Sequence, residues 1–520
     1  MALSSRPFLR EISLRPDVPI DFTNYPFNIP AIRELGALQF HPRVTFLVGE
    51  NGAGKSTLLE AIAVAMGLPA EGGSRNVNRP QQPVSALADA LRLIKGFQQP
   101  RWSYFLRAES AFDVISYMDH IGAPVQPPAD TPPPEDSLHR RSHGQAFLQL
   151  LMDLKGDGFY LLDEPEAALS PNRQLAALDL IDQLVKSGAQ LIIATHSPIL
   201  LAYPDALIYR CDESGIAPCA YDDTEHYAVT RDFLRHHRRR LSQLLERPLD
   251  THRPDGAMAA LAALEQLGRE LQGGPPSSRL FLRSIALDPA ARIDFDRYPF
   301  AIPAVRSLGV LKFDSPVTFL VGENGAGKST LLEAIALAMG LPAEGGSQNA
   351  SRLQQAPSIL HSALQIDRGH RRPGWSYFLR AETAFDLISY DDNTFIESGW
   401  TPPPSLHTRS HGEGFMNLLQ RLSKNGFYLL DEPEAALSPN RQLAALAIID
   451  DLVQAGSQLI IATHSPILLA YPGAKIWVCD ASGISVTAYE DTEHVAVTRD
   501  FLNHYPRRLE QLLGGAEDTE

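Results

Sequence analysis

The sequence predicts an α/β fold in which two similar modules each carry a largely parallel central sheet. Three observations predict it. Apolar runs bounded by turn residues alternate with stretches of helical periodicity. The whole pattern occurs twice along the 520 residues. In both occurrences, a glycine-rich loop connects an apolar run to the helical stretch that follows it.

The internal repeat shows that the chain is a duplication. The segment VTFLVGENGAGKSTLLEAIA begins at Val44 and again at Val317, 273 residues later. The segment GFYLLDEPEAALSPNRQLAAL begins at Gly158 and at Gly426, which is an offset of 268. The second copy has therefore lost a net five residues between these segments, within a proline-rich stretch where a surface loop is expected.

The repeat sets the predicted domain organisation. We place one module at 1–248 and the other at 278–520, joined by a helical or flexible linker at 249–277 that is rich in Ala and Leu and ends in Gly-Gly-Pro-Pro. Within each module, the runs VTFLVG, YFLRAE, GFYLLD and QLIIATH predict buried strands. The run LIYRCDESGIAPCAYDD predicts an antiparallel hairpin.

Composition narrows the class of protein. No segment approaches the roughly 18 apolar residues of a membrane span, and the three cysteines form no CxxC pair, so we expect a soluble, cytoplasmic protein. The net charge of −15 argues against a surface that binds nucleic acid everywhere. One basic cluster stands out at 235–240, RHHRRR, and it is either a solvated helix face or a nucleic-acid contact.

The glycine-rich loops match the pattern G-x-x-x-x-G-K-S between a strand and a helix. Such loops turn backbone amides toward phosphates, the lysine reaches the terminal phosphates, and the serine hydroxyl binds Mg²⁺. We therefore predict Mg²⁺ and ATP as ligands, because a chance glycine-rich turn does not explain two matches in the same setting. The predicted phosphate-binding residues are Gly49, Asn51, Gly52, Gly54, Lys55, Ser56 and Thr57, and Gly322, Asn324, Gly325, Gly327, Lys328, Ser329 and Thr330.

Two adjacent carboxylates end the strand FYLLDE in each module. Asp163 and Asp431 suit Mg²⁺, together with the loop serines, Ser56 and Ser329. Glu164 and Glu432 are placed to polarise an attacking water. A strand that ends in two acids is a solvated edge in the alternative interpretation, but its position downstream of a phosphate loop favours the catalytic one.

The following strand, QLIIATH, ends at His196 and at His464 in the two modules. Each histidine is either a structural residue or a neutral hydrogen-bond donor to the γ-phosphate, and its place on the same sheet edge suits the second role. Between the carboxylates and the histidine, Ser170 and Ser438 precede a proline and a helical stretch, so both are candidate helix N-caps.

In this order the motifs resemble the ATP-binding-cassette (ABC) superfamily of P-loop NTPases. The strings FLRAES, LDEPEAALSP and ATHSPILLAYP are similar to those of its small stand-alone members, labelled AAA-family or SMC-like ATPases. The resemblance covers nearly all of both copies. It implies ATP hydrolysis, a small helical subdomain in each module, and a D-loop role for Ser170 and Ser438.

The resemblance also implies a signature motif that reaches across a head-to-tail pair of modules to the other γ-phosphate. The matching residues are Ser142, His143, Gly144 and Gln145 in the first module, and Ser410, His411, Gly412 and Glu413 in the second. A histidine takes the place of the usual first glycine, which departs from the common LSGGQ. An ordinary helix N-cap explains the serine but not the repeated His-Gly.

A glutamine is implied where the core sheet passes into the helical subdomain, but the strand YFLRAE has none. It supplies Arg107 with Glu109, and Arg380 with Glu382. Either glutamate takes over the role toward Mg²⁺ and water, or arginine and glutamate form a structural ion pair. An adenine-stacking aromatic is also implied, and the candidates are Tyr25, Phe27, Phe40, Tyr298, Phe300 and Phe313.

The client of the ATP cycle is left open by the sequence. No sustained heptad pattern lies between the phosphate loop and the signature, so the coiled-coil arm of SMC proteins is absent. We expect an ATP-gated pair of modules, within one chain or in a homodimer, that acts on nucleic acid or on an effector protein, as in DNA repair or anti-phage defence. The alternatives are an ATP-hydrolysing transporter subunit that recruits separate membrane subunits, and a scaffold that binds ATP but barely hydrolyses it.

Overall fold

The computed structural model describes residues 7–74, 86–107, 143–246, 280–343, 345–347, 359–380 and 411–514. These residues form two compact units. The first contains the chain up to Arg231 together with the residues from Val497 onward, and the second contains Asp232–Ala496. The limits 1–248 and 278–520 stay a prediction, and the expected linker 249–277 lies outside the described residues.

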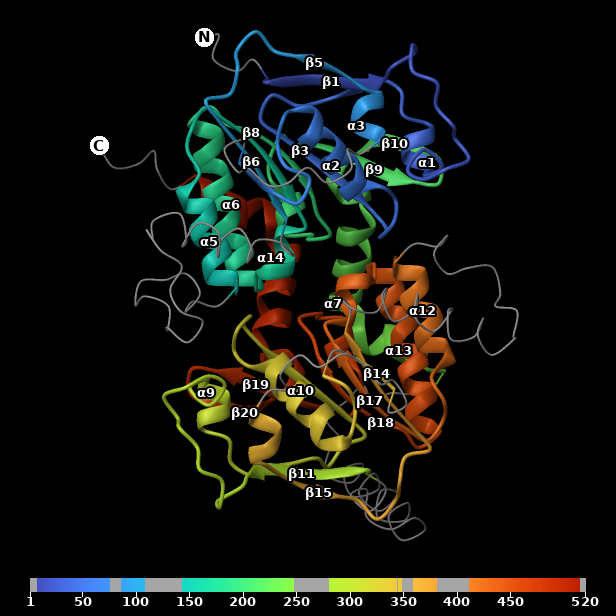
Figure 1. Cartoon of the computed structure of the whole chain (residues 1–520), viewed down its shortest axis with the longest axis vertical. Helices are drawn as coiled ribbons and strands as arrows, with labels where there is room; N and C mark the ends of the chain where they lie inside the picture. The colour runs from blue at the N-terminus through green and yellow to red at the C-terminus, as the bar shows by residue number, and fades with distance from the viewer. Residues whose placement is uncertain are drawn as a thin grey trace. The chain divides into compact units, whose positions relative to one another are not determined.

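A seven-stranded sheet forms the centre of the first unit (Figure 1). Its inner strands, β9 to β6, run parallel, and the two outer strands, β10 and β4, pair antiparallel to their neighbours. This confirms the predicted α/β class. In order across the sheet, the strands are β10 (Gly215–Cys219), β9 (Leu207–Asp212), β3 (Val44–Gly49), β8 (Gln190–Ala194), β7 (Gly158–Asp163), β6 (Trp102–Arg107) and β4 (Gly73–Ser74).

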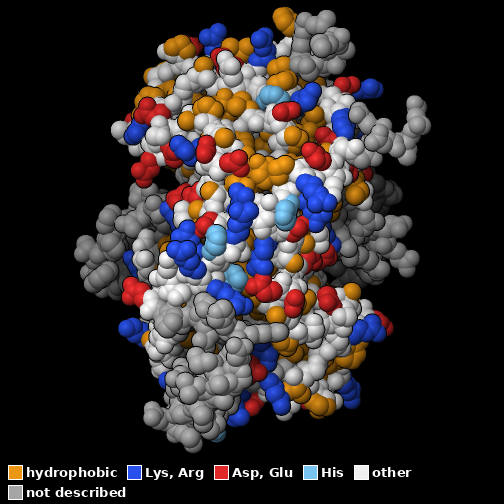
Figure 2. All heavy atoms as spheres, turned by 180° about the vertical axis from the view of Figure 1, so that it is seen from behind, with side chains coloured by type: hydrophobic (Ala, Val, Ile, Leu, Met, Phe, Trp, Pro, Cys, Tyr) orange, Lys and Arg blue, Asp and Glu red, His pale blue; other side chains and the backbone are white. Residues whose placement is uncertain are grey.

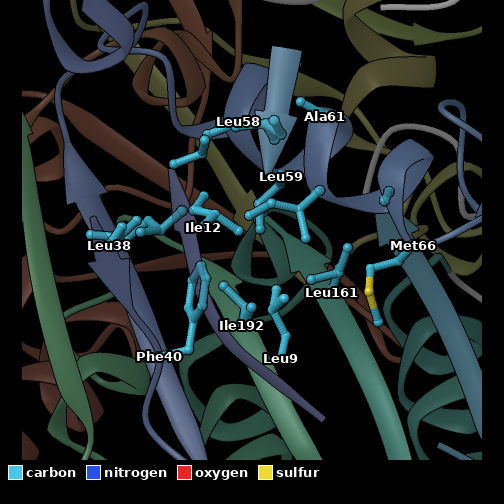
Figure 3. Close-up of a cluster of buried hydrophobic side chains, with 14 of the residues drawn as sticks. Leu9, Ile12, Leu38, Phe40, Leu58, Leu59, Ala61, Met66, Leu161 and Ile192 are labelled. Atoms are coloured by element: carbon cyan, nitrogen blue, oxygen red, sulfur yellow. The ribbon is translucent and has the colours of Figure 1, made fainter. Parts of the chain in front are cut away.

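A smaller antiparallel sheet lies over one face of the large one. Its strands are β2 (Leu38–Gln39), β1 (Leu9–Leu14) and β5 (Leu91–Lys95), in that order. Helix α2 (Lys55–Ala65) packs between the two sheets, with Leu58 and Leu59 against Ile12 of β1 and Ile192 of β8 in one buried cluster (Figure 3). Because both sides of this helix meet a sheet, its sequence KSTLLEAIAVA is apolar almost all round.

The buried strands have the continuous apolar sequences expected of a parallel sheet covered on both faces. All six residues of β7 are buried. The remaining helices of the first module are α1 (Pro30–Arg33), α3 (Ala86–Ala90), α5 (His143–Asp153), α6 (Pro171–Lys186) and α7 (Glu225–Leu244), with short 3-10 helices η2 (Pro165–Ala168), η3 (Leu200–Ala202) and η4 (Tyr221–Asp223).

The second unit repeats this architecture. Its large sheet is β14 (Gly346–Ser347), β16 (Trp375–Arg380), β17 (Gly426–Asp431), β18 (Gln458–Ala462), β13 (Val317–Gly322), β19 (Lys475–Asp480) and β20 (Gly483–Thr487). Its small sheet is β12 (Leu311–Lys312), β11 (Leu282–Leu287) and β15 (Leu364–Arg368). Its helices are α9 (Pro303–Arg306), α10 (Lys328–Met339), α12 (His411–Arg421), α13 (Pro439–Gln454) and α14 (Glu493–Leu513), with η6 (Ile359–Ala363), η8 (Pro433–Ala436), η9 (Leu468–Ala470) and η10 (Tyr489–Asp491).

The last helix of each module is divided between the units. Helix α7 begins in the first unit and its residues from 232 onward belong to the second, whereas α14 begins in the second unit and its residues from 497 onward belong to the first. Both helices lose helical backbone geometry at an equivalent histidine, His236 or His504.

Equivalent contacts hold the exchanged segments. In the first unit, Tyr505 of α14 lies edge-on to Tyr221, with ring centroids 4.9 Å apart. In the second unit, His237 of α7 lies against Tyr489, with centroids 5.0 Å apart. Each pair occupies corresponding positions of the two sequence copies, so the exchange is reciprocal.

Among the described residues, no helix combines the length and apolarity needed to cross a bilayer. On the face drawn in Figure 2, acidic and basic side chains are interspersed over much of the surface. This mixture agrees with the composition of 61 acidic against 46 basic residues.

Candidate functional site

The predicted site residues of each module meet at one edge of the large sheet. Strands β3, β8 and β7 are parallel neighbours, so their carboxyl ends lie side by side. The glycine-rich loop follows β3, Asp163 and Glu164 come at the end of β7, and His196 follows β8. Ligands of open α/β sheets bind at this edge, where loops and helix N-termini face the ligand.

The glycine-rich loop has a backbone that other residues would not adopt. Gly49 has a φ of +149°, and a Cβ built on it would lie 2.1 Å from the carbonyl oxygen of Cys211. Gly54 has a φ of +95° and is the N-cap of α2, so the first amides of that helix face the loop. The loop can therefore present backbone N–H groups to an anion.

The loop lysine is buried and held by the loop itself. Lys55 Nζ donates hydrogen bonds to the carbonyl oxygens of Gly49, at 2.9 Å, and Glu50, at 3.0 Å. Lys328 makes the equivalent bonds to Gly322 and Glu323, at 2.8 and 3.1 Å. Burial lowers the pKa of both lysines, and the nearby carboxylates oppose that effect.

A hydroxyl and a carboxylate stand together as the predicted metal ligands. Ser56 Oγ donates to Asp163 Oδ1 at 3.0 Å, and Ser329 Oγ to Asp431 Oδ1 at the same distance. In the part of the chain that the structure describes, no group of three or more His, Cys, Asp or Glu could hold a metal alone. These few oxygen donors fit Mg²⁺, which takes most of its ligands from phosphates and water.

Arginine from the neighbouring strand balances the buried aspartate. Arg107 at the end of β6 lies 3.4 Å from Asp163 Oδ2 and 3.6 Å from Glu60 Oε2. Arg380 pairs in the same way with Asp431 and Glu333. Glu109 and Glu382, the other half of the predicted Arg–Glu alternatives, lie outside the described residues.

Burial shapes the charge of the aspartates. Desolvation, with the adjacent Glu164 carboxylate, raises the pKa of Asp163 to about 7 despite the opposing charge of Arg107. The same causes raise the pKa of Asp431. A divalent cation beside these oxygens would favour the ionised form, so metal binding and loss of this proton are coupled.

Glu164 and Glu432 have strained backbones. Their φ angles are +51° and +50°, in the left-handed region that residues other than glycine rarely adopt. Burial raises the pKa of Glu164, but His196, Lys55 and Arg107 outweigh burial and lower that pKa below its ordinary value. The carboxylate is therefore ionised at neutral pH and can accept a hydrogen bond from water.

The histidine that follows β8 or β18, His196 or His464, is called here the switch-position histidine. Each of the two lies between a carboxylate and a second histidine. His196 Nε2 is 3.5 Å from Glu164 Oε1, and His196 Nδ1 is 2.8 Å from His226 Nε2. His464 has the same distances to Glu432 and His494. Burial lowers the pKa of all four imidazoles, so these pairs are neutral at physiological pH.

Glu166 accepts hydrogen bonds from the loop that follows β8 and contains His196. Its Oε2 accepts from Thr195 Oγ1 at 2.6 Å, and its Oε1 accepts from the backbone N–H of His196. Desolvation, with the charge of Glu164, raises the pKa of Glu166 to about 7. Glu434 makes the corresponding bonds, and its pKa is raised to about 7 for the same reasons.

The predicted D-loop serines are N-cap residues without a capping bond. Ser170 and Ser438 precede α6 and α13, yet neither side chain caps its helix, and both Oγ atoms are buried without a hydrogen-bond partner. The segment before α6 is instead linked to the loop after β8 through Gln174, which accepts from Ser197 Oγ at 2.6 Å and donates to Leu169 O at 2.9 Å.

The signature segments are described only in part. Helices α5 and α12 begin at His143 and His411, so each His-Gly stands at a helix start. Ser142 and Ser410 lie outside the described residues. The prediction that these segments contact a γ-phosphate therefore stays a prediction.

The aromatic candidates separate clearly by burial. Phe40, Phe300 and Phe313 are packed in the hydrophobic core. Tyr25 is 72% exposed, and its hydroxyl lies 3.4 Å from Thr57 Oγ1 at the start of α2. Tyr298 is the equivalent residue and is 71% exposed. These two tyrosines are the most exposed of the candidates, whereas Phe27 is partly buried against the core.

Two protein families match the chain, each of them twice. A family described as "AAA domain" matches residues 27–95 and 304–372, which include both glycine-rich loops. A family described as "AAA domain, putative AbiEii toxin, Type IV TA system" matches 145–202 and 415–470, which include the carboxylates and histidines. The chain carries two AAA/ABC-type P-loop ATPase modules.

Sequence relatives of this ATPase include two hemin import ATP-binding proteins. The chain is similar to the hemin import ATP-binding protein HmuV of Deinococcus radiodurans, with 25% identity over 224 residues, 38% of this chain and 85% of the relative. It is also similar to HmuV of Nocardia farcinica, with 27% identity over 274 residues, 46% of this chain and 88% of the relative. ATP hydrolysis is therefore the activity of the two modules.

Solved structures resemble the ATPase at low identity. UvrA2 from Deinococcus radiodurans has 14% identity and a TM-score of 0.36, with 71% of this chain and 53% of UvrA2 covered. The SMC head domain from Thermotoga maritima has 18% identity and a TM-score of 0.24, with 41% and 99% covered. Both TM-scores lie below 0.5, so the fold assignment rests on the strand order of the ATPase itself.

Sequence reasoning missed two residues of each ATPase site. Glu166 and Glu434 stand two positions after Glu164 and Glu432, within the repeated LDEPEAALSP, and their occurrence in both copies is a signal that was available. His226 and His494 lie in the repeated DTEH, 30 residues beyond the switch-position histidine. Nothing local in the sequence indicates that this segment returns to the sheet edge.

Proposed function

We propose that each module binds Mg·ATP and hydrolyses it at the sheet edge. The observation that carries this proposal is the meeting of Lys55, Ser56, Asp163, Glu164 and His196 there, repeated in the second module. Lys55 and the loop amides bind the phosphates and neutralise their charge. Ser56 and Asp163 hold Mg²⁺, which supplies charge stabilisation to the phosphate oxygens.

Two side chains of each site act on the attacking water and the γ-phosphate. Glu164 accepts a hydrogen bond from the water and orients its lone pair. His196, neutral and 3.5 Å from that carboxylate, donates from its ring to the γ-phosphate as negative charge develops. Tyr25, exposed beside the start of α2, stacks on the adenine ring. Glu432, His464 and Tyr298 take these roles in the second module.

We further propose that the modules pair head to tail as an ATP-gated clamp, within one chain or between two chains. Each signature segment then completes the site of the other module at a helix start. The buried, unpartnered hydroxyls of Ser170 and Ser438 suit residues that find partners on closure. The reciprocal division of α7 and α14 between the units supports coupling within the chain.

The double variant Glu164→Gln/Glu432→Gln tests the hydrolytic assignment. Gln keeps the shape of the side chain but loses the carboxylate, so we expect turnover to fall at least a hundredfold while ATP binding persists. The matched control is Glu213→Gln, an exposed glutamate in the turn between β9 and β10. Unchanged hydrolysis in the double variant would refute the assignment.

The mass of the same variant distinguishes the two forms of clamp. Light scattering with and without Mg·ATP measures it directly. A monomer in both states supports pairing within one chain, whereas a doubling of mass on ATP addition supports pairing between chains.

We propose that the ATPase works in the cytoplasm and that its ATP cycle acts on nucleic acid or on an effector protein. The support is the basic cluster on α7, where Arg235, Arg238, Arg239 and Arg240 are exposed. Exposed arginines on one helix can contact phosphates even in a chain of net charge −15. ATPase stimulation by DNA or RNA that is lost in Arg238→Ser/Arg239→Ser would support nucleic acid as the molecule acted on. No stimulation of the wild type at low salt would exclude nucleic acid.

The second candidate is an ATP-hydrolysing subunit of a transporter. The observation that favours it is the similarity to the two HmuV proteins, which are hemin import ATP-binding proteins. Because no described helix can cross a membrane, this candidate requires separate membrane subunits. Co-purification of the tagged chain with an integral membrane protein from detergent extracts would support it, and ATPase activity that responds only to nucleic acid would oppose it.

A further inference from the structure

A pair of histidines is buried behind the catalytic edge of each module. His196 Nδ1 and His226 Nε2 are 2.8 Å apart, and His464 Nδ1 and His494 Nε2 are also 2.8 Å apart. The two rings of each pair have centroids 4.9 Å apart. The second histidine lies in the first turn of α7 or α14 and is 3% exposed in both cases.

A contact of 2.8 Å between two neutral imidazole nitrogens requires one proton between them. If His196 donates from Nδ1, its Nε2 is bare and can only accept. If His226 donates from its Nε2, then His196 Nδ1 accepts, and His196 Nε2 carries the remaining proton. The two arrangements give His196 opposite chemistry toward the sheet edge.

The groups that face His196 Nε2 favour the second arrangement. This nitrogen lies 3.5 Å from Glu164 Oε1 at the sheet edge, and the proposed donor role toward the γ-phosphate requires a proton on it. A bare Nε2 would place a lone pair against that carboxylate, whereas Nε2–H can donate to it or to a phosphate oxygen. His464 faces Glu432 at the same distance, so the argument holds for both modules.

We propose that His226 and His494 are positioning residues that donate from Nε2 to the switch-position histidines and fix them as Nε2–H tautomers, with the proton directed to the γ-phosphate side. This inference rests on the proposed donor role of His196 and His464. It explains why a hydrogen-bonding histidine, and not an apolar side chain, occupies this buried position. A carboxylate or backbone carbonyl orients many catalytic and metal-bound histidines by accepting from a ring N–H, whereas here the second histidine would donate to the ring nitrogen.

The tautomer can be measured without any variant. In the full chain labelled with ¹⁵N-histidine, a protonated and a bare ring nitrogen have widely separated ¹⁵N shifts. His196→Gln and His464→Gln assign the signals by their loss. We expect the two switch-position rings to show a protonated Nε2 and a bare Nδ1. A protonated Nδ1 would overturn the proposal.

Paired variants test the consequence for turnover. His226→Gln/His494→Gln keeps an amide donor near the Nε2 position, and His226→Met/His494→Met fills the space without a donor. We expect the Met pair to lower kcat about tenfold to a hundredfold with little change in KM, and the Gln pair to recover most of that loss. Equal kcat in both pairs, with melting temperatures close to that of the wild type, would contradict a positioning role.

The failure of the proposed function gives a different result. If His196→Gln/His464→Gln leaves turnover unchanged, the donor role is wrong, whatever the tautomer. If those variants lose turnover and the Met pair keeps both turnover and the Nε2–H signals, only the positioning role is wrong.

Discussion

Glu166 and Glu434 carry an ionisation cost that should appear in the pH dependence of stability. Both are buried glutamates with a pKa raised from an ordinary 4.5 to about 7. The group stabilises the fold when protonated, so its contribution is fully present below pH 4.5 and is lost as pH rises through 7. Between pH 5 and pH 8 that loss is at most about 2.5 kcal/mol for each carboxyl.

The double variant Glu166→Gln/Glu434→Gln removes this pH dependence. The Gln carbonyl can still accept from the backbone N–H of His196, and the amide can donate to Thr195 Oγ1. The Thr195 hydroxyl, which donates to Glu166 Oε2, then loses its acceptor, so a pH-independent loss of about 1 kcal/mol is expected. The quantity that tests the prediction is therefore the pH dependence of the difference in unfolding free energy between variant and wild type.

Thermal unfolding of the metal-free chain at pH 5 and pH 8 is the assay. About 2 kcal/mol corresponds to a shift of roughly 4–8 °C for a unit of this size. The melting temperature of the variant, relative to that of the wild type, should rise by this amount as the pH is raised from 5 to 8. The control Glu213→Gln, at an exposed turn, should follow the wild type at both values. A constant difference between variant and wild type across this range would refute the raised pKa.

Three further predictions concern the nucleotide and the core. Lys55→Ala or Lys328→Ala alone should lower ATP turnover about tenfold or more, because a buried phosphate contact is lost, and steady-state ATP hydrolysis by the single and double variants checks it. Tyr25→Ala/Tyr298→Ala should raise KM for ATP severalfold with kcat nearly unchanged, as steady-state kinetics would detect, whereas substitution to Phe should preserve KM. Leu59→Ala should destabilise the first unit by about 2–5 kcal/mol, measured by urea unfolding, because the side chain is fully buried between two sheets.

Much of the large sheet could be predicted because its strands carry their own signal. A continuous apolar run such as residues 158–163 predicts a strand buried on both faces, and the structure buries all six of its residues. The small sheet gave a weaker signal, because β5 has mixed polarity and exposes Ile94. Its pairing with β1 joins segments about 80 residues apart, and no local pattern encodes that register.

The site residues also differ in whether a local sequence pattern predicts them. Ser56 and Asp163 could be predicted as partners because each lies in a motif whose chemistry fixes its role, and they lie 3.0 Å apart. His226 could not, because a histidine at a helix start has no motif and meets His196 only through tertiary folding. Exposure likewise separated Tyr25 from Phe40, since both are aromatic residues before the loop and only burial distinguishes them.

The division of α7 and α14 between the units changes what a boundary means in this chain. Residues 497–514 are encoded at the end of the second copy, yet they form part of the first unit, while residues 232–246 do the reverse. A single cut at 249–277 therefore yields two fragments, neither of which contains all of one unit. Each half of the chain therefore supplies a segment that completes the unit formed mainly by the other half.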